Sequence, residues 1–448
     1  TNMMNRRNFI KRSAIASGAI AIPTIVSASA LGKNGFIAAN DRIVMAGIGL
    51  GGMGRGDMNR FVNSKQVQYV ALCDVDKNQW VKAQEILKKA GFNDVRNYID
   101  YRELLEKEEL DAVHTALPDH WHAIPTIEAA KKGLDIYGQK PLARSIKESR
   151  AIVDAVEKYN IVWQTGSQQR SGGQFHRACE LVRNGVIGEV KYVEVGLPDG
   201  GHKGGNPDPM PVPEGVDWDM WLGPAPKVPY RGVLHWDWRW IKAYSGGQLT
   251  DWAGHHIDIA KWGLGLERTG PVNIKGEGER RKNDIFNVPY KYEIECEYEN
   301  GVEMKIANKS EFQKRKGKGW DARDKKETRI GMGPVWYGED GWIHVNRAGI
   351  WASDPKFLEV KFTDNDIRLY RSRNHHQNFI ECVRSRKETV APAEIGHRSI
   401  SVALLGEIAI DVDKKLEWDP KAERFTNSDK ANDLLLRPYR SPWKMPKI

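Results

Sequence analysis

Three side chains in this sequence have the types and spacing for acid–base chemistry on a hydroxyl group. Asp251 and His255 lie four positions apart in a segment whose pattern predicts a helix, so they should share one helical face. A carboxylate in that position can orient an imidazole, and histidine is a natural general base. Lys140 ends an expected strand and precedes Pro141, so its ammonium could reach the same hydroxyl. The alternatives are a buried Asp–His pair that faces the core and a surface lysine in a loop.

The same helical face should include Asp258 and Trp262, whereas His256 should project elsewhere. Tryptophans are concentrated in this part of the chain, and their flat faces suit the apolar faces of sugars, although packing in a core is the commoner use of tryptophan. Seven of the sixteen fall close together: Trp218, Trp221, Trp236, Trp238, Trp240, Trp252 and Trp262. The residues that we expect to hold substrate hydroxyls are His122, Arg239, Tyr244, Asp251 and His255.

A glycine-rich turn follows the first expected strand, residues 42–48. Residues 49–54 read G-L-G-G-M-G, the pattern in which glycines permit a tight turn, a close approach of backbone amides to a pyrophosphate, and close packing of a helix. An overlapping match begins at Gly47. We prefer the register Gly49, Gly51 and Gly54, because the apolar strand then ends at the turn. A packing turn without a ligand would have the same sequence.

The next expected strand, residues 67–75, closes with Asp74, twenty residues after Gly54. A carboxylate in that position accepts hydrogen bonds from the adenosine ribose and repels a 2′-phosphate, which favours NAD over NADP. Asp76 could share this role. We expect the cofactor to be bound by Gly49, Gly51, Gly52, Met53, Gly54, Asp74, Pro118, His122 and Lys140.

Alternating strand and helix patterns continue to residue 166. We expect helices at residues 77–90, 120–133 and 146–159 and strands at residues 110–117, 134–138 and 161–165. This alternation predicts an α/β domain with a doubly wound parallel sheet, a Rossmann fold over residues 41–166. Ligands of such sheets bind at the carboxyl ends of the strands, which is where residues 118–122 and 139–141 should lie.

Residues 167–448 have longer loops and alternating strand patterns. Residues 290–308, with a turn at Glu299-Asn300-Gly301, predict an antiparallel hairpin. We expect an α+β domain with a large, mostly antiparallel open sheet that serves for substrate binding and oligomerisation. The C-terminal segment could pack back on the first domain.

The composition is that of an ordinary globular protein, with 40% hydrophobic and 28% charged residues in 448. The four cysteines are far apart with no C-x-x-C pair, so we expect no metal site and no disulfide framework. The formal charge is +9, but four of the positive side chains lie among the first twelve residues and the others are mixed with acidic ones. We therefore expect no binding to nucleic acid.

The first forty residues have the order of a signal peptide and linker. Residues 5–11 read N-R-R-N-F-I-K, and an uncharged stretch follows that contains the small-residue site Ala28-Ser29-Ala30. The paired Arg6-Arg7 looks like a twin-arginine signal, which implies export of a folded protein to the periplasm, with no membrane span after cleavage. The alternative is an N-terminal membrane anchor, which the weak hydrophobicity and Pro23 disfavour.

Taken together, these motifs resemble the Gfo/Idh/MocA oxidoreductases, from about Arg42 to the C-terminus. The resemblance rests on the glycine turn, Asp74, residues 118–122, Lys140-Pro141 and the helix with Asp251, His255 and Asp258. It implies that Lys140, Asp251 and His255 are the catalytic residues. The C-terminal motifs L-E-W-D-P at residues 416–420 and P-Y-R-S-P-W at residues 438–443 are similar to those of exported members of sugar-degrading bacteria.

Two positions depart from the family pattern. Gln139 precedes the lysine where the family usually has Glu, and a neutral amide would hold Lys140 by hydrogen bonding without favouring its charged form. Ala253 stands where the family has a glycine, with Gly254 following, which puts the packing of the helix in question.

The resemblance implies an NAD(P)-dependent oxidoreductase that interconverts a secondary hydroxyl and a ketone on a sugar, glycoside or cyclic polyol. One alternative is an NAD-dependent glycosidase that acts through a transient keto intermediate, and another is a non-catalytic sugar- or NAD-binding protein. Because an exported enzyme meets little free NAD, the cofactor could be tightly bound. The resemblance also implies a homodimer or homotetramer.

Overall fold

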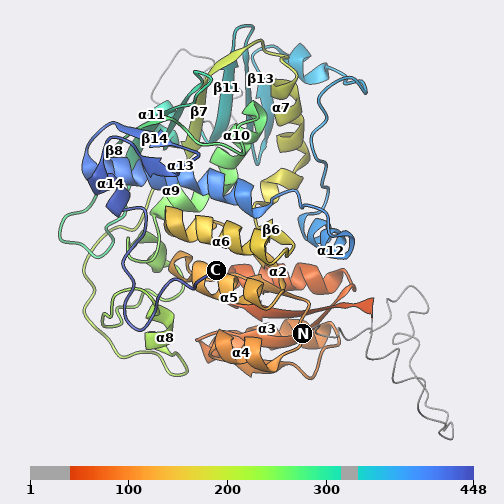
Figure 1. Cartoon of the computed structure of the whole chain (residues 1–448), viewed down its shortest axis with the longest axis vertical. Helices are drawn as coiled ribbons and strands as arrows, with labels where there is room; N and C mark the ends of the chain where they lie inside the picture. Colours follow the sequence, from red (N-terminus) through yellow and green to blue (C-terminus); the bar gives the residue numbers. More distant parts are fainter. Residues whose placement is uncertain (1–40, 314–330) are drawn as a thin grey trace, which may run out of the picture. The chain divides into compact units, whose positions relative to one another are not determined.

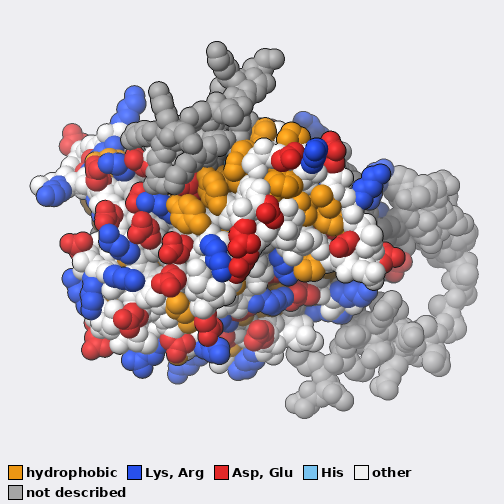
Figure 2. Space-filling view, turned by 90° about the horizontal axis from the view of Figure 1, so that it is seen from above, with side chains coloured by type: hydrophobic (Ala, Val, Ile, Leu, Met, Phe, Trp, Pro, Cys, Tyr) orange, Lys and Arg blue, Asp and Glu red, His pale blue; other side chains and the backbone are white. Residues whose placement is uncertain are grey.

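The computed structural model describes residues 41–313 and 331–448, of which residues 43–448 form one compact unit. The expected signal peptide and linker lie outside the described residues. No helix in these two ranges is long and apolar enough to cross a membrane, and no group of three or more candidate ligands within them could hold a metal ion. On the face shown in Figure 2, acidic and basic side chains are interspersed.

The first domain is built on a six-stranded parallel sheet of order β3-β2-β1-β4-β5-β6, which confirms the Rossmann fold (Figure 1). The order reverses between β1 and β4, so a crevice opens at the carboxyl ends of these two strands. The strands are β1 (Ile43–Ile48), β2 (Val67–Cys73), β3 (Arg96–Tyr98), β4 (Ala112–Thr115), β5 (Asp135–Gly138) and β6 (Trp163–Thr165). The helices are α2 (Gly52–Asn63), α3 (Lys77–Lys89), α4 (Tyr101–Lys107), α5 (Ala123–Lys131) and α6 (Ile146–Lys158). The sequence patterns did not predict β3 and α4.

The second domain has a nine-stranded sheet of order β13-β12-β11-β7-β10-β9-β8-β14-β15. Among the described strands of this second sheet, only β7 and β10 pair in parallel, so the sheet is mostly antiparallel, as expected. Its strands are β7 (Val190–Leu197), β8 (Asn273–Glu279), β9 (Lys291–Glu297), β10 (Glu303–Asn308), β11 (Gly333–Gly338), β12 (Trp342–Asn346), β13 (Gly349–Ala352), β14 (Leu416–Asp419) and β15 (Arg424–Phe425). The predicted hairpin is present as β9 and β10, and Gly301 in its turn has a φ of +79°.

The remaining described α-helices all follow β6 in the chain. They are α7 (Gly173–Arg183), α8 (Trp218–Leu222), α9 (Gly247–Trp252), α10 (Asp258–Leu264), α11 (Lys309–Gln313), α12 (His375–Ser385), α13 (Ala393–Val412) and α14 (Asp429–Asp433). The long α13 contacts β8 on one side and α6 on the other. Near the C-terminus, Arg437 and Tyr439 bind Glu148 of α6, so this end of the chain packs on the first domain.

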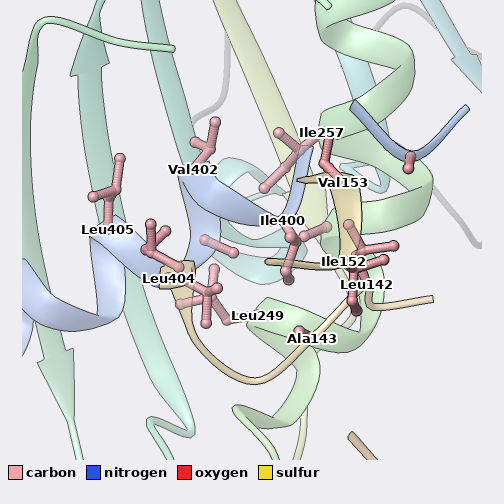
Figure 3. Packing of buried hydrophobic residues seen from close by; sticks show 14 of the residues in the cluster. Leu142, Ala143, Ile152, Val153, Leu249, Ile257, Ile400, Val402, Leu404 and Leu405 are labelled. Carbon is pink, nitrogen blue, oxygen red and sulfur yellow. The ribbon is translucent and has the colours of Figure 1, made fainter. Parts of the chain in front are cut away.

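The helix expected around residues 246–262 is interrupted. A π-helical turn, Ala253–Ile257, separates α9 from α10. An extra residue in this turn rotates the residues that follow it about the helix axis, and such turns are frequent at functional sites. The core fixes this arrangement, because Leu249 and Ile257 pack with Leu142, which follows Lys140-Pro141, and with Ile400 of α13 (Figure 3). The two chain segments that carry the candidate acid–base residues therefore share one core.

Candidate active site

The glycine turn between β1 and α2 has the geometry that a dinucleotide requires. Gly49 has a φ of +86°, and its N–H donates to the Cys73 carbonyl at 2.9 Å. A Cβ atom on Gly54 would lie 2.0 Å from the Gly49 carbonyl oxygen, whereas a Cβ on Gly52 would meet nothing within 4 Å. The close-packed third glycine is therefore Gly54, as in the register that we preferred.

The start of α2 faces the cavity that this turn borders. Gly51, Gly52 and Met53 line that cavity, and the first turn of α2 holds no acidic side chain. Backbone N–H groups at a helix N-terminus attract anions, so the pyrophosphate of a dinucleotide fits here.

Asp74 lies directly after β2 on the wall of the same cavity. Its Oδ2 accepts a hydrogen bond from the Leu50 N–H at 2.7 Å, and its Oδ1 accepts one from the Asp76 N–H at 2.9 Å. Burial raises the pKa of Asp74 to about 6, although both backbone hydrogen bonds favour the carboxylate. At neutral pH the carboxylate is an acceptor, so the residue fits the ribose hydroxyls of NAD.

One cavity joins these nucleotide-binding residues to the candidate acid–base residues. Its walls include Gly49, Asp74, Pro118, Lys140 and Asp251. The second domain supplies the opposite wall with Met220, Trp221, Leu234, His235, Trp238 and Arg239. A ligand that extends from Asp74 to Lys140 would be held between the two domains.

Lys140 and Asp251 form an ion pair in this cavity. The ammonium Nζ lies 2.7 Å from Asp251 Oδ1 and 3.3 Å from the Asp251 carbonyl oxygen. The side chains are only 11% and 22% exposed. Burial opposes ionisation of Asp251, but the nearby Lys140 ammonium outweighs it and holds the pKa of Asp251 below its usual value. Asp251 is therefore a carboxylate at neutral pH.

His255 differs from the expectation that Asp251 orients it. The Asp251 carboxylate binds Lys140 instead, and the buried His255 Nδ1 has no hydrogen-bond partner. The π turn causes this difference, because it breaks the i, i+4 spacing of a regular helix. Burial, and then the positive charge of Lys140, lower the pKa of His255 well below its usual value, so the imidazole is neutral. His255 is not among the residues that line the cavity.

Asp258 and Trp262, expected on the face of Asp251, belong to a separate buried cluster. Asp258 accepts two hydrogen bonds from the Arg170 guanidinium, at 2.6 and 2.8 Å, and one from the Ser399 hydroxyl. The guanidinium also lies over the Trp262 ring. This cluster fixes α10 and does not contribute to the cavity.

His122, which we expected to hold cofactor and substrate, is not among the residues that line the cavity. Its Nδ1 lies 2.6 Å from the Pro141 carbonyl oxygen and its Nε2 lies 2.8 Å from the Leu117 carbonyl oxygen. Because both ring nitrogens face backbone carbonyls, His122 instead joins the loop after β4 to the loop that carries Lys140.

Of the other two substrate candidates, the structure places only Arg239 at the cavity. Tyr244 is buried against Trp221 and His120, and burial raises its pKa far above the ordinary value, so it serves packing. Arg239 lines the cavity, and its guanidinium lies 4.3 Å from the ring centre of Trp236 and 4.4 Å from that of Trp238.

Gln139 does not bind Lys140. Its Nε2 donates to Asp57 Oδ2 of α2 at 2.7 Å, and Asp57 Oδ1 lies 2.9 Å from His376 Nε2. Asp57 is fully buried. A glutamate at position 139 would place a second carboxylate against Asp57, which explains the neutral amide in physical terms.

Sequence reasoning missed several cavity residues. Asp119 lines the cavity, accepts a hydrogen bond from the Ser245 hydroxyl at 2.5 Å, and has its pKa raised by burial. Its place in the segment 118–122 was a usable signal. No sequence pattern indicated His235, because it lies in the long connection between β7 and α9 and reaches the cavity only when that connection is folded.

Comparison with known proteins agrees with this architecture. Residues 42–167 match the family described as "Oxidoreductase family, NAD-binding Rossmann fold", and residues 200–317 and 363–445 match "Oxidoreductase family, C-terminal alpha/beta domain". Among curated relatives, an uncharacterized oxidoreductase of Streptococcus pneumoniae is 30% identical over 182 residues, 40% of this chain and 41% of that protein. A glycosyl hydrolase family 109 protein of Shewanella sp. (strain ANA-3) is 27% identical over 207 residues, 43% of this chain and 45% of that protein. The matches thus span less than half the length of these relatives.

Solved structures share the fold at low sequence identity. An aldose-aldose oxidoreductase from Caulobacter crescentus has a TM-score of 0.58 at 16% identity, and a myo-inositol 2-dehydrogenase from Lactobacillus plantarum has 0.55 at 18%. Both comparisons cover 84% of this chain and 99% of the other. Together with the family matches over both domains, this shows that the chain belongs to the Gfo/Idh/MocA oxidoreductase family.

Proposed function

We propose that the protein is an NAD-dependent oxidoreductase that interconverts a secondary hydroxyl and a ketone on a sugar, glycoside or cyclic polyol. The observation that carries this proposal is that the Lys140–Asp251 ion pair lies in the same cavity as Asp74 and the glycine turn. A ligand bound along the glycine turn would end beside the only ammonium among the residues that line this cavity.

NAD, when bound, would supply the hydride acceptor. Lys140 Nζ donates a hydrogen bond to the substrate oxygen and stabilises the negative charge that develops on it, while Asp251 holds the ammonium in place. His255 is not on the cavity wall, so removal of the hydroxyl proton requires the substrate hydroxyl to reach the neutral imidazole, whose Nδ1 is unpartnered, and to pass its proton there. The carbon–hydrogen bonding pair would leave as hydride to bound NAD, which would give a ketone, a reduced cofactor and a protonated base.

A carbohydrate substrate is supported by the aromatic groups beside the cavity. Trp236 is 62% exposed, and its ring stacks on Arg239, which lines the cavity. An exposed indole next to a guanidinium offers a flat apolar face and hydrogen-bond donors side by side, as a sugar ring requires. Most of the other tryptophans of this part are buried and pack the core.

Glycoside cleavage through a transient ketone is the second candidate. It is favoured by the similarity to glycosyl hydrolase family 109 proteins over 43% of this chain. Oxidation at one carbon would acidify the neighbouring C–H bond, and the hydride would return to the sugar after cleavage. The net reaction would then consume no NAD.

We also propose export through the twin-arginine signal and self-association. Export is supported by the pattern of residues 5–30, which lie outside the described part. Self-association is supported by β13, the last strand at one end of the sheet, where Ile350 and Trp351 are partly exposed. Light scattering after gel filtration of the mature chain should give a mass of at least twice the monomer, and a mass of one chain would exclude the oligomer.

The proposed reaction is tested by mixing the purified chain and NAD with a panel of free sugars, aryl glycosides and cyclic polyols. Net oxidation gives rising absorbance at 340 nm and a keto product. The second candidate gives a released sugar that requires NAD without net absorbance change. If NAD and sugars bind but neither product forms with any compound, the protein is a binding protein and both enzymatic proposals are wrong.

A further inference from the structure

We propose that residues 213–217 of the second domain, which we call the strap, hold the two domains together beside the adenosine end of the cofactor cavity and must detach before NAD can be exchanged. The inference rests on the proposed function in that the cofactor is NAD. It extends that function by assigning second-domain residues to the nucleotide site.

The strap is bound by its backbone to the end of β2 and the start of α3. The Lys77 N–H donates to the Gly215 carbonyl at 3.0 Å, and the Asp217 N–H donates to the Val75 carbonyl at 2.9 Å. Asp76 and Val216 thus form an antiparallel bridge between the domains. These bonds begin one residue after Asp74, the residue that fits the adenosine ribose.

The side chains around the strap strengthen this attachment. Asn78 Nδ2 donates to the Glu214 carbonyl at 3.4 Å. Farther along the same connection, His235 Nε2 lies 3.6 Å from Asp76 Oδ2. Asp76 therefore lies between the second domain and the point where the first domain would hold the ribose.

The strap does not line the cavity, but it fixes the residues that do. Helix α8 follows the strap directly and carries Met220 and Trp221, which line the wall opposite Val75. In Figure 1, α8 and the chain beside it lie next to the first domain, away from the nine-stranded sheet. With the strap in place, the adenosine end is bounded by both domains.

Further contacts hold α8 from its other side. The Trp121 indole N–H donates to the Trp221 carbonyl at 2.8 Å. Near the C-terminus, Arg440 binds the Gly223 carbonyl at 2.9 Å and Asp219 at 2.8 Å. With α8 anchored there, the strap is the segment that our proposal requires to move, and its bonds to Val75 and Lys77 are those that would break on release of the cofactor.

A retained cofactor limits the class of reaction. A hydride accepted from one substrate must return to the same substrate or to a second carbonyl compound before the next turnover. The strap therefore favours redox-neutral chemistry over a reaction that consumes one free NAD per cycle.

A disulfide can lock the strap. A Cβ atom on Gly215 would lie 3.5 Å from the Cβ of Lys77, within the range found in disulfides. The variant Lys77→Cys/Gly215→Cys of the full chain is loaded with NAD and oxidised with glutathione disulfide. Exchange of bound NAD for isotope-labelled NAD is then followed by mass spectrometry. The four native cysteines are buried.

We expect exchange in the oxidised variant to be about tenfold slower or more than in the same protein after reduction, because the strap must open for release. The single variants Lys77→Cys and Gly215→Cys are the controls. Because Gly215 has a φ of +83°, the variant Gly215→Cys also shows how much the strain of a side chain at this position changes the exchange rate. Equal exchange rates in the oxidised and reduced forms, with the disulfide verified, would overturn the proposal.

A loosened strap gives an independent measurement. The variant Asn78→Ala removes the side-chain contact to the Glu214 carbonyl and leaves every residue that lines the cavity unchanged. We expect faster exchange than in the parent, and an unchanged rate would contradict the proposal. Neither experiment needs turnover. If exchange is slow and depends on the strap but the protein oxidises no sugar, only the proposed function is refuted. If the parent protein binds no NAD, the proposed function and the role of the strap are both refuted.

Discussion

The Lys140 ammonium lies 2.7 Å from the Asp251 carboxylate, and the two residues come from different domains. Lys140 follows β5 of the Rossmann sheet, and Asp251 belongs to α9 of the second domain. The pair therefore exists only when the two domains are packed, as does the cavity in which it lies. In this arrangement Asp251 is a positioning residue for Lys140, and His255 is left with a neutral, unpartnered ring nitrogen.

Replacing His255 with Asn should lower kcat by roughly a hundred- to ten-thousand-fold, with little change in NAD affinity, because the base would be lost and the cofactor contacts kept. Since burial lowers the pKa of His255 well below its usual value, the base is already neutral at pH 6. We thus expect kcat/KM to stay flat from pH 8 to pH 6 and to fall only at lower pH. If His255→Asn lost little kcat and Lys140→Met lost all activity, the result would show that Lys140 is the base instead.

NAD binding should weaken as the pH falls through the raised pKa of Asp74, about 6. Above this value Asp74 is a carboxylate that accepts from ribose hydroxyls, and below it the protonated form loses that capacity. The dissociation constant should rise by up to about tenfold per pH unit below pH 6. Tryptophan fluorescence titrations at pH 5 to 8 measure it. Asp74→Asn is the control, with weaker binding and no such pH dependence, and a parent with pH-independent affinity would refute the role of Asp74.

The variant Gln139→Glu should be destabilised by roughly 2 to 4 kcal/mol, because it buries two carboxylates against each other at Asp57. One of the two carboxyls would keep its proton to higher pH in the folded protein than in the unfolded chain. Stability is then lost as the pH rises, so the deficit should be larger at pH 8 than at pH 5.

Urea unfolding at the two pH values measures this deficit. The double variant Gln139→Glu/Asp57→Asn exchanges the positions of amide and carboxylate and should recover much of the stability. A double variant as unstable as the sum of its single changes would show that the two side chains do not interact.

Trp236→Ala should raise KM for carbohydrate substrates, with kcat and NAD affinity nearly unchanged. The indole is exposed and stacks on Arg239 outside the reacting centre. Loss of one stacked aromatic face weakens binding by about 1 kcal/mol, or severalfold in KM. Trp236→Phe keeps an aromatic face and should retain most of the affinity. An unchanged KM in Trp236→Ala would remove this residue from the substrate site.

The parts of the site that depend on local sequence were predicted. The turn from Gly49 to Gly54 depends on backbone geometry within six residues. The position of Asp74 follows from its distance from that turn along one βαβ unit. The alternating patterns were sufficient for the Rossmann order and for the hairpin of β9 and β10.

The parts that depend on distant packing were not predicted. The π turn at residues 253–257 arises where α10 is held by Arg170 and α13, and no periodicity within the helix indicates that contact. His122 was assigned to ligands because its partners, two backbone carbonyls, have no sequence signature. The partner of Gln139 is on α2, eighty-two residues earlier, so only the structure explains the missing glutamate.

The most direct test of hydride transfer is to quench the reaction during turnover and measure the nicotinamide by mass spectrometry. The full chain, loaded with NAD, is mixed with carbon-deuterated glycosides and free sugars, and the cofactor is recovered within the first turnovers. We predict reduced cofactor that carries deuterium in the parent and none in Lys140→Met. This holds for net oxidation and for a redox-neutral cycle alike. Unlabelled, fully oxidised NAD in the parent with every compound, although sugar and NAD are bound, would contradict the account.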